Sequence, residues 1–195
     1  YWRRRGLDDK TIVRFGLGYA PNDGQALYQY LRDKGYNQQE LDASGLFKRS
    51  QSGRIYCLFW KRVMTPIFDL RGNIIAFGGR VMDDSKPKYV NSPETLVYHK
   101  SETVFAMQIA KRSASRRFVL CEGYMDVISM QQAGIDTAVC ACGTALTPGQ
   151  VRIISEYADE VILSYDSDEA GQKATLRSLE LFRNSPVKVG VLQIP

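Results

Sequence analysis

The sequence lacks the cysteine and histidine spacing of a zinc site. It holds one histidine, His99, and four cysteines, and no two cysteines form a Cys-x-x-Cys pair. Structural zinc sites use closely spaced cysteine and histidine ligands, so this pattern argues against such a centre. The cysteines all lie in apolar runs typical of strands: Cys57, Cys121, Cys140 and Cys142. We therefore expect reduced, buried cysteines and no zinc.

The chain also lacks long apolar runs and the common phosphate-binding loops. No run approaches the roughly eighteen consecutive apolar residues of a membrane span, and the first five residues, Tyr-Trp-Arg-Arg-Arg, have no apolar signal region. We expect a cytoplasmic protein without a membrane partner. Neither GxGxxG nor GxxxxGKS occurs, so Gly78-Gly79 and Gly16-x-Gly18 predict tight backbone positions rather than nucleotide loops.

What the chain does have is an uneven distribution of charge. The net charge is +5 over 195 residues, of which 44% are hydrophobic. Residues 1–116 hold 20 Lys/Arg and 11 Asp/Glu, a charge of +9, whereas residues 117–195 hold 6 Lys/Arg and 10 Asp/Glu, a charge of −4. A basic segment attracts phosphate backbones, and clustered carboxylates commonly bind divalent metal. The charge pattern favours a nucleic-acid partner and a metal site.

Strand and helix patterns alternate in residues 117–195. Apolar runs predict strands at residues 118–122, 137–142, 160–165 and 187–194. Helical patterns lie between them at residues 124–133, 147–157 and 169–183, and Thr147-Pro148 is a typical helix start. This alternation predicts a parallel sheet with right-handed crossovers and flanking helices, which is an α/β fold.

Residues 1–116 have a less regular pattern that predicts an α+β subdomain. Helices are expected at residues 8–15, 25–34 and 38–44, and β-prone segments at residues 54–60, 62–69 and 73–80. Arg71-Gly72-Asn73 predicts the hairpin turn between the last two segments. Residues 100–113 are predicted to form a connecting helix that leads to a domain boundary after Arg116.

Four acidic side chains are expected at one edge of the predicted parallel sheet. Glu122 ends the first strand, and Asp126 lies in the first turn of the helix after it. Asp166 and Asp168 follow the third strand with an i, i+2 spacing that directs both carboxylates to one side. Because Mg²⁺ or Mn²⁺ would relieve the repulsion among these acids, the pattern predicts a metal site for phosphoryl transfer.

Two of these acids also have a purely structural interpretation. Asp168 is placed to cap the helix at residues 169–183, and Asp126 is a first-turn acid that the helix dipole favours. The joint order of strand, Glu-Gly and helix, followed by strand, Asp-x-Asp and helix, favours the metal site over these separate interpretations.

The motifs around the acids resemble the TOPRIM domain that topoisomerases and primases share. They read Glu122-Gly123-Tyr124-Met125-Asp126 and, at residues 165–171, YDSDEAG, and the Tyr-Met-Asp continuation is similar to that of bacterial primases. The resemblance to DnaG-type primases extends through the first part of the chain. Its segments are RGL at 5–7, FGLGYAP at 15–21, RVMTPI at 62–67, FGGR at 77–80 and PKYVNSPET at 87–95.

The resemblance implies a DNA primase, a nucleotidyltransferase that makes short RNA primers. It makes Glu122, Asp166 and Asp168 catalytic metal-site acids with Asp126 as a supporting ligand, and it implies Mg²⁺ or Mn²⁺ as the cofactor. It assigns template and nucleotide binding to residues that neutralise phosphates or stack on a base: Arg5, Arg62, Arg80, Lys88, Tyr89, Asn91 and Lys100. The alternative for any one of these is a solvated basic surface.

The resemblance also implies partners and missing parts. The partners are a single-stranded DNA template, ribonucleoside triphosphates, the RNA primer and a replicative helicase, the last bound through a region outside this sequence. The family has a further acidic pair beyond the fourth strand and an amino-terminal zinc module, and this sequence contains neither. We therefore expect a catalytic-core fragment: residues 1–116 bind template and nucleotide, and residues 117–195 form a TOPRIM subdomain truncated before its last acidic motif.

Two alternatives stay open. The first is a TOPRIM nuclease or topoisomerase fragment, but a topoisomerase needs a nucleophilic tyrosine and none of the 11 tyrosines is marked out by its surroundings. The second is a non-catalytic TOPRIM module that binds DNA. Such a module has no need of all three acids Glu122, Asp166 and Asp168, so their presence argues against it.

Overall fold

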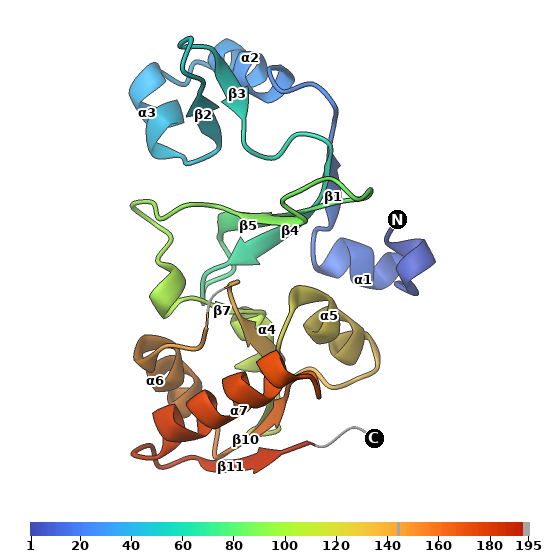
Figure 1. Ribbon diagram of the computed structural model, residues 1–195, viewed down its shortest axis with the longest axis vertical. Coiled ribbons are helices and arrows are strands. Elements are labelled where there is room, and N and C mark those ends of the chain that lie inside the picture. Colours follow the sequence, from blue (N-terminus) through green and yellow to red (C-terminus); the bar gives the residue numbers. More distant parts are fainter. Residues whose placement is uncertain (144, 193–195) are drawn as a thin grey trace. The chain divides into compact units, whose positions relative to one another are not determined.

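The computed structural model describes residues 1–143 and 145–192, and the chain folds into two compact units (Figure 1). The first unit consists of Tyr1–Ile67 and Ile74–His99, and the second consists of Phe68–Asn73 and the chain from Lys100 onward. Among the described residues, no helix combines the length and the apolar character needed to cross a membrane.

The first unit is built on a four-stranded sheet with strand order β1-β4-β5-β6. Its longer strands are β4 (Arg62–Phe68) and β5 (Ile74–Val81), which lie between β1 (Gly18–Ala20) and β6 (Tyr89–Asn91). β1 pairs antiparallel with β4, and β6 pairs antiparallel with β5. The strands predicted at residues 62–69 and 73–80 are confirmed. β1 and β6 were missed because three residues are too few for an alternating pattern to stand out.

Three helices and a hairpin complete the first unit. The helices, which confirm the predictions, are α1 (Asp9–Arg14), α2 (Ala26–Asp33) and α3 (Gln38–Ala43). The hairpin pairs β2 (Phe47–Arg49) with β3 (Ile55–Cys57). The strand predicted at residues 54–60 ends at Cys57 because residues 58–61 form a turn in which Lys61 has a φ of 53°.

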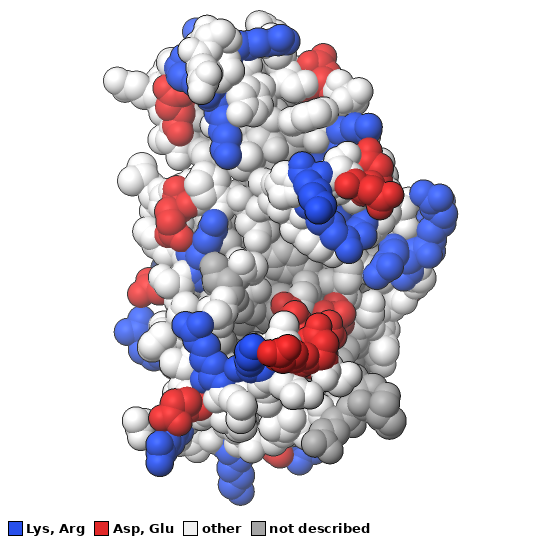
Figure 2. Space-filling view, in the orientation of Figure 1, with Lys and Arg blue, Asp and Glu red and all other residues white. Residues whose placement is uncertain are grey.

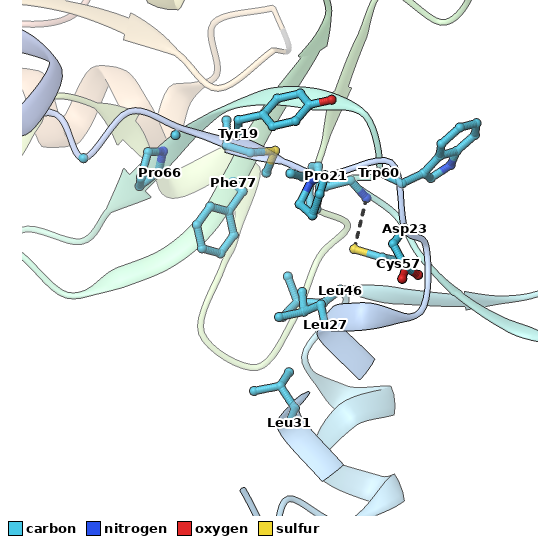
Figure 3. A pocket seen from close by; sticks show the side chains of 15 residues that line it. Tyr19, Pro21, Asp23, Leu27, Leu31, Leu46, Cys57, Trp60, Pro66 and Phe77 are labelled. Carbon is cyan, nitrogen blue, oxygen red and sulfur yellow. Dashed lines mark hydrogen bonds between the residues drawn. The ribbon is translucent and has the colours of Figure 1, made fainter. Parts of the chain in front are cut away.

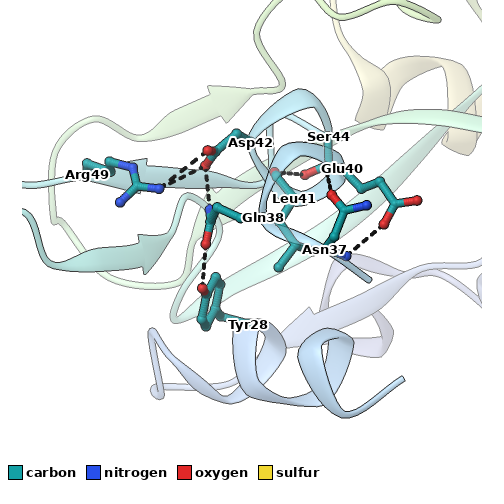
Figure 4. Close-up of polar contacts among 8 residues, drawn as sticks. All are labelled: Tyr28, Asn37, Gln38, Glu40, Leu41, Asp42, Ser44 and Arg49. Carbon is teal, nitrogen blue, oxygen red and sulfur yellow. Dashed lines mark hydrogen bonds and ion pairs between the residues drawn. The ribbon is translucent and has the colours of Figure 1, made fainter. Parts of the chain in front are cut away.

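Helix α3 begins with a capping box (Figure 4). The side-chain oxygen of Asn37 accepts a hydrogen bond from the Glu40 N–H at 3.0 Å, and the Glu40 carboxylate accepts one from the Asn37 N–H at 2.7 Å. The Tyr28 hydroxyl, on α2, donates to the side-chain oxygen of Gln38 at 2.7 Å. These contacts satisfy the first N–H groups of α3 and join it to α2.

The second unit contains a five-stranded sheet with strand order β11-β10-β8-β9-β7. Four strands pair in parallel: β8 (Arg117–Cys121), β9 (Ala138–Ala141), β10 (Glu160–Ser164) and β11 (Lys188–Val191). Three helices alternate with them along the chain: α5 (Tyr124–Gln132), α6 (Pro148–Tyr157) and α7 (Glu169–Phe182) (Figure 1). The predicted α/β fold, with a parallel sheet and flanking helices, is confirmed.

The core of the second unit lies between its sheet and the helices that follow the strands. Phe118 and Leu120 of β8 are buried together with Leu163 of β10, Ile154 of α6 and Phe182 of α7. Each fully buried side chain of this size contributes roughly 1.5–3 kcal/mol through removal of apolar surface from water. The four cysteines of the chain are buried thiols outside any disulfide, as expected.

The helix predicted at residues 100–113 is wrong. The segment contains a 3-10 helix, Lys100–Glu102, then strand β7 (Val104–Phe105), then the short helix α4 (Met107–Ala110). β7 pairs antiparallel with β9, and Ala106 has a φ of 63°, which a continuous helix excludes. Residues 103–107 are all buried, so the segment enters the core as an extended run instead of presenting one helical face.

This segment also accounts for where the two units divide. The division falls between His99 and Lys100, whereas the boundary was expected after Arg116. Because β7 completes the second sheet, the residues that were expected to connect the two parts belong structurally to the second unit.

Gln150 joins α6 to the segment before β7 and is completely buried. Its amide nitrogen donates to the carbonyl oxygens of Lys100 at 2.8 Å and Thr103 at 2.9 Å, and its oxygen accepts from the Thr147 N–H at 3.1 Å. We expect Gln150→Leu to lower the free energy of unfolding by about 3 kcal/mol, because three backbone groups lose their hydrogen bond to this buried side chain. Denaturant unfolding measures this change.

The matched control is Gln39→Leu, at an exposed position of α3. It is expected to change stability by less than about 0.5 kcal/mol. Equal effects of the two substitutions would contradict the structural role of Gln150.

Candidate functional site

The carboxyl ends of β8 and β10 place Glu122 beside Asp166. The two strands are parallel neighbours, and Cys121 lies opposite Ser164 in their register. Glu122 follows β8 directly, and Asp166 follows β10 after one intervening residue, so both emerge at the same edge of the sheet. The Asp166 N–H donates a hydrogen bond to Oε2 of Glu122 at 3.3 Å.

Asp126 is turned toward the start of its own helix. One of its carboxylate oxygens, Oδ2, accepts a hydrogen bond from the Gly123 N–H at 2.9 Å, at the residue that caps α5. This is the first-turn role that the helix dipole favours. The structural interpretation of Asp126 is therefore observed, and a supporting role in metal binding stays a prediction.

Asp168 caps α7, and the helix packs closely on the Asp-x-Asp segment. The Oδ1 atom of Asp168 accepts a hydrogen bond from the Gly171 N–H at 2.8 Å. A Cβ atom at Gly171 would lie 2.0 Å from the carbonyl oxygen of Asp166, so only glycine fits this contact. The cap and the glycine together fix the start of α7 against the backbone of Asp166.

The four acids do not converge as closely as the sequence predicted. In the described part of the chain, no group of three or more histidine, cysteine, aspartate or glutamate side chains is arranged to hold a metal ion. Figure 2 shows carboxylates gathered around the start of α7, but Asp126 and Asp168 each direct one oxygen to a backbone N–H. Each hydrogen bond lets a backbone N–H stabilise the negative charge of one carboxylate.

The donor chemistry nevertheless fits a hard divalent cation. Glu122 and Asp168 each have a second carboxylate oxygen beyond the one that accepts a backbone N–H, and Asp166 is exposed. Mg²⁺ and Mn²⁺ prefer oxygen ligands of this kind, and Mg²⁺ is commonly held by only one or two protein carboxylates.

A cavity of about 370 Å³, here called the edge cavity, opens beside Glu122. It is lined by Arg177 and Ser178 of α7 and by Cys121 and Tyr165 at the strand ends. The hydroxyl groups of Tyr165 and Ser178 are hydrogen-bonded at 3.1 Å. Burial raises the pKa of the Cys121 thiol to about 12 and raises the pKa of Tyr165, so both stay neutral near pH 7.

Arg177 is a candidate functional residue that the sequence reasoning missed. The available signal was its position in the predicted helix, about one turn after Ala174 and on the same helix as the glycine of the Asp-x-Asp motif. Helical spacing alone does not say which face meets the strand ends, so the residue was not singled out.

Arg80 and Tyr89 form a stacked pair in the first unit. They lie opposite each other on β5 and β6, and the Arg80 Nε donates to the Tyr89 hydroxyl at 3.2 Å. The Arg80 guanidinium carbon lies 5.3 Å from the ring centroid of Tyr1 and 5.7 Å from that of Tyr89. Tyr89 is 51% exposed, so the pair presents a positive charge and an aromatic face to solvent.

Arg62 is buried, which differs from its expected contact with nucleotide or template. Only 7% of Arg62 is exposed, and its guanidinium donates to the carbonyl oxygens of Pro87 at 3.0 Å and Lys88 at 3.3 Å. Burial lowers the pKa of Arg62. The guanidinium therefore positions the segment that leads into β6 and Tyr89.

The other predicted binding residues occupy separate places. Arg5 is exposed in the 3-10 helix Arg3–Arg5, Lys88 is exposed just before β6, and Asn91 ends β6 opposite Gly78. Lys100 belongs to the second unit, where its carbonyl oxygen accepts from Gln150. The structure thus gathers Arg80, Lys88, Tyr89 and Asn91 around one pair of strands.

A second cavity, of about 410 Å³, lies within the first unit (Figure 3). Leu27 and Leu31 of α2, Leu46, and Phe77 of β5 line it, and α2 has no fully buried residue. Asp23 is the only charged residue among its described lining residues. This apolar lining supports packing or an apolar ligand and does not indicate phosphoryl-transfer chemistry.

Two families match the chain. The family described as DNA primase catalytic core, N-terminal domain, matches residues 1–111, and the family described as Toprim-like matches residues 119–195. The expected boundary after residue 116 lies between the two matches.

A curated relative agrees with these family matches. A DNA primase of Clostridium acetobutylicum is 43% identical over 196 residues, which cover all of this chain and 33% of that protein. The chain therefore spans about a third of the length of this curated relative.

Solved structures agree as well. A structure of Aquifex aeolicus primase with its zinc-binding and RNA polymerase domains has a TM-score of 0.92 and 35% identity, covering 100% of this chain and 49% of that one. A DnaG primase catalytic domain bound to single-stranded DNA has a TM-score of 0.89 and 35% identity, covering 100% and 64%. The chain belongs to the DNA primase catalytic core family, with the N-terminal domain in residues 1–111 followed by a Toprim-like domain.

Proposed function

We propose that this chain forms part of the catalytic core of a primase that synthesises short RNA primers on single-stranded DNA by metal-dependent nucleotidyl transfer. The observation that carries the proposal is the pairing of Glu122 with Asp166 at neighbouring strand ends, in a chain of the primase core family. The full protein would act in the cytoplasm and engage a replicative helicase through a region outside residues 1–195.

Glu122, Asp166 and Asp168 are the residues that would hold Mg²⁺ or Mn²⁺, with Asp126 in a supporting place. A bound divalent ion supplies charge neutralisation for the nucleotide phosphates and for the attacking and leaving oxygens. The protein residues contribute position: the Asp166 N–H orients the Glu122 carboxylate, and the Asp168 cap holds α7 against the Asp-x-Asp segment.

The proposed reaction joins two ribonucleotides. The 3′-hydroxyl oxygen of one forms a bond to the α-phosphorus of the next, and its proton is released to water. The bond from the α-phosphorus to the oxygen that bridges to the β-phosphate breaks, and that oxygen leaves with the electron pair as part of pyrophosphate. No covalent intermediate with the protein is required.

The first unit would bind the nucleic acid. Arg80, Lys88 and Asn91 supply charge and hydrogen bonds, and the exposed ring of Tyr89 supplies a stacking surface for an unpaired base. The relative with bound single-stranded DNA supports a DNA partner for this chain. Arg5 and Lys100 are additional proposed phosphate ligands, and Arg62 acts by positioning residues 87–88.

Binding of single-stranded DNA is expected to weaken steeply with salt, because phosphate contacts release counterions. Arg80→Ala and Lys88→Ala should each reduce the slope of log K against log salt by about 0.7, the value for one contact with a single strand. Fluorescence anisotropy with a labelled oligonucleotide at several salt concentrations measures the slope.

The control is Arg49→Ala in the same unit, because Arg49 is engaged with Asp42 at 3.3 Å. It should leave the slope unchanged. Salt-independent binding, or equal slopes for all three variants and the parent, would remove the basic residues from the proposal.

Template-dependent RNA synthesis tests the function itself. A form of the protein extended past residue 195 is supplied with single-stranded DNA, ribonucleoside triphosphates and Mg²⁺ or Mn²⁺. We expect short RNA products that depend on the template and the metal. An extended protein that binds DNA but makes no RNA would contradict primer synthesis and favour a DNA-binding module.

A further inference from the structure

Arg177 lines the same cavity as Glu122, yet it is not committed to an ion pair. The neighbouring basic residues on α7 do form ion pairs, because Lys173 pairs with Glu169 and Arg183 pairs with Glu180. Within residues 1–143 and 145–192, Arg177 has no such carboxylate partner. A guanidinium at an acidic edge of the sheet, without a carboxylate to neutralise it, is suited to an anionic ligand.

The position of Arg177 is fixed by the same contacts that build the Asp-x-Asp segment. Gly171 allows α7 to approach the Asp166 carbonyl, and Asp168 caps the helix start. Two turns later, Ser178 is hydrogen-bonded to Tyr165 at the end of β10. The helix is therefore held at two points on the strand ends, and Arg177 lies between them in the sequence, next to Ser178.

Small side chains leave space between the acid and the guanidinium. Ala141, Ala145 and Ala174 line the edge cavity, whose volume of about 370 Å³ lies in the range of small-ligand sites. Glu122 and Arg177 both line this space. The cavity therefore offers a carboxylate and a guanidinium with open volume, which suits a phosphate group accompanied by a divalent ion.

We propose that Arg177 binds the pyrophosphate released by nucleotidyl transfer. This inference rests on the proposed function and adds the residue that receives the leaving group. The breaking bond delivers its electron pair to the pyrophosphate, and the planar guanidinium donates two parallel hydrogen bonds to the oxygens on which that charge accumulates. Glu122 repels bare pyrophosphate, so binding is expected only with a divalent ion present.

The test measures binding of inorganic pyrophosphate by the 195-residue protein in the presence of Mg²⁺ or Mn²⁺, using isothermal titration. We expect Arg177→Ala to weaken binding by about tenfold or more, because a charge-assisted bidentate contact is lost. Arg177→Lys keeps the positive charge but not the planar guanidinium, so its affinity for pyrophosphate should fall between that of the parent and that of Arg177→Ala. Arg183→Ala, in which a basic residue already paired with Glu180 is removed from the end of the same helix, is the matched control and should bind like the parent.

The readout does not require RNA synthesis, so the two proposals fail separately. Equal affinity of the parent and Arg177→Ala, or no binding to the parent with either metal, would overturn the inference about Arg177. Pyrophosphate binding that depends on Arg177 in an extended protein that makes no RNA would instead overturn primer synthesis and leave the pyrophosphate site standing. Circular dichroism of each variant verifies that the fold is retained.

Discussion

Glu122→Gln is expected to reduce template-dependent RNA synthesis by roughly a hundredfold to a thousandfold in the extended protein. The substitution keeps the shape of the side chain but removes the negative charge that would hold a divalent cation. Its amide oxygen still accepts the Asp166 N–H, and the position is exposed, so the fold should be unaffected. The loss should therefore appear in the rate of RNA synthesis and not in the melting temperature.

The control is Glu156→Gln, the same substitution at an exposed position of α6. It should leave RNA synthesis within about twofold of the parent, because an isolated surface charge contributes little. Raising the Mn²⁺ concentration should recover part of the activity of Glu122→Gln if weakened metal binding causes the loss. Full activity of Glu122→Gln would rule out a metal-binding role for this acid.

Gly171→Ala is expected to have the largest effect on folding of any single-methyl change at the site. The added Cβ would lie 2.0 Å from the Asp166 carbonyl oxygen and 2.8 Å from its carbonyl carbon, and both are backbone atoms that cannot rotate away. Either α7 or the Asp-x-Asp segment must shift, at a cost of at least about 3 kcal/mol. Denaturant unfolding of the 195-residue protein measures the loss of stability.

The matched control is Gly18→Ala, because a Cβ at Gly18 meets no atom within 4 Å. It should change stability by less than about 1 kcal/mol. In the extended protein, Gly171→Ala should also lose most RNA synthesis, since displacement of Asp166 moves it away from Glu122. A fully stable and active Gly171→Ala protein would show that the close packing of α7 on this segment is not needed.

Much of the second unit was predictable because its patterns are local. The strands β8 to β11 and the helices α5 to α7 were found within a few residues, since each is a short apolar run or a helical pattern bounded by caps such as Thr147. Residues 193–194 of the last predicted strand lie outside the described residues. The segment at residues 100–113 failed because a run of residues buried on all sides has no periodicity from which helix and strand can be told apart.

The acids show the same division between local and tertiary information. Their placement at the carboxyl edge followed from strand order, and the register of β8 against β10 brings Glu122 next to Asp166. Asp126 and Asp168 accept hydrogen bonds from the N–H groups at the starts of α5 and α7, and their share in a metal site stays a prediction. Helix-cap potential was visible in the sequence, but its competition with metal binding depends on side-chain orientation.

By itself, the sequence determined the fold class of the second unit, the edge of its sheet at which Glu122 and Asp166 lie, and the family of the chain. All three depend on local patterns and motif order. Only the tertiary structure decided that Arg62 is buried against the backbone of residues 87–88 and that Arg177 shares a cavity with Glu122. The physical reason is that burial and pairing of a charged side chain depend on residues distant in the sequence, which packing brings near and local pattern does not specify.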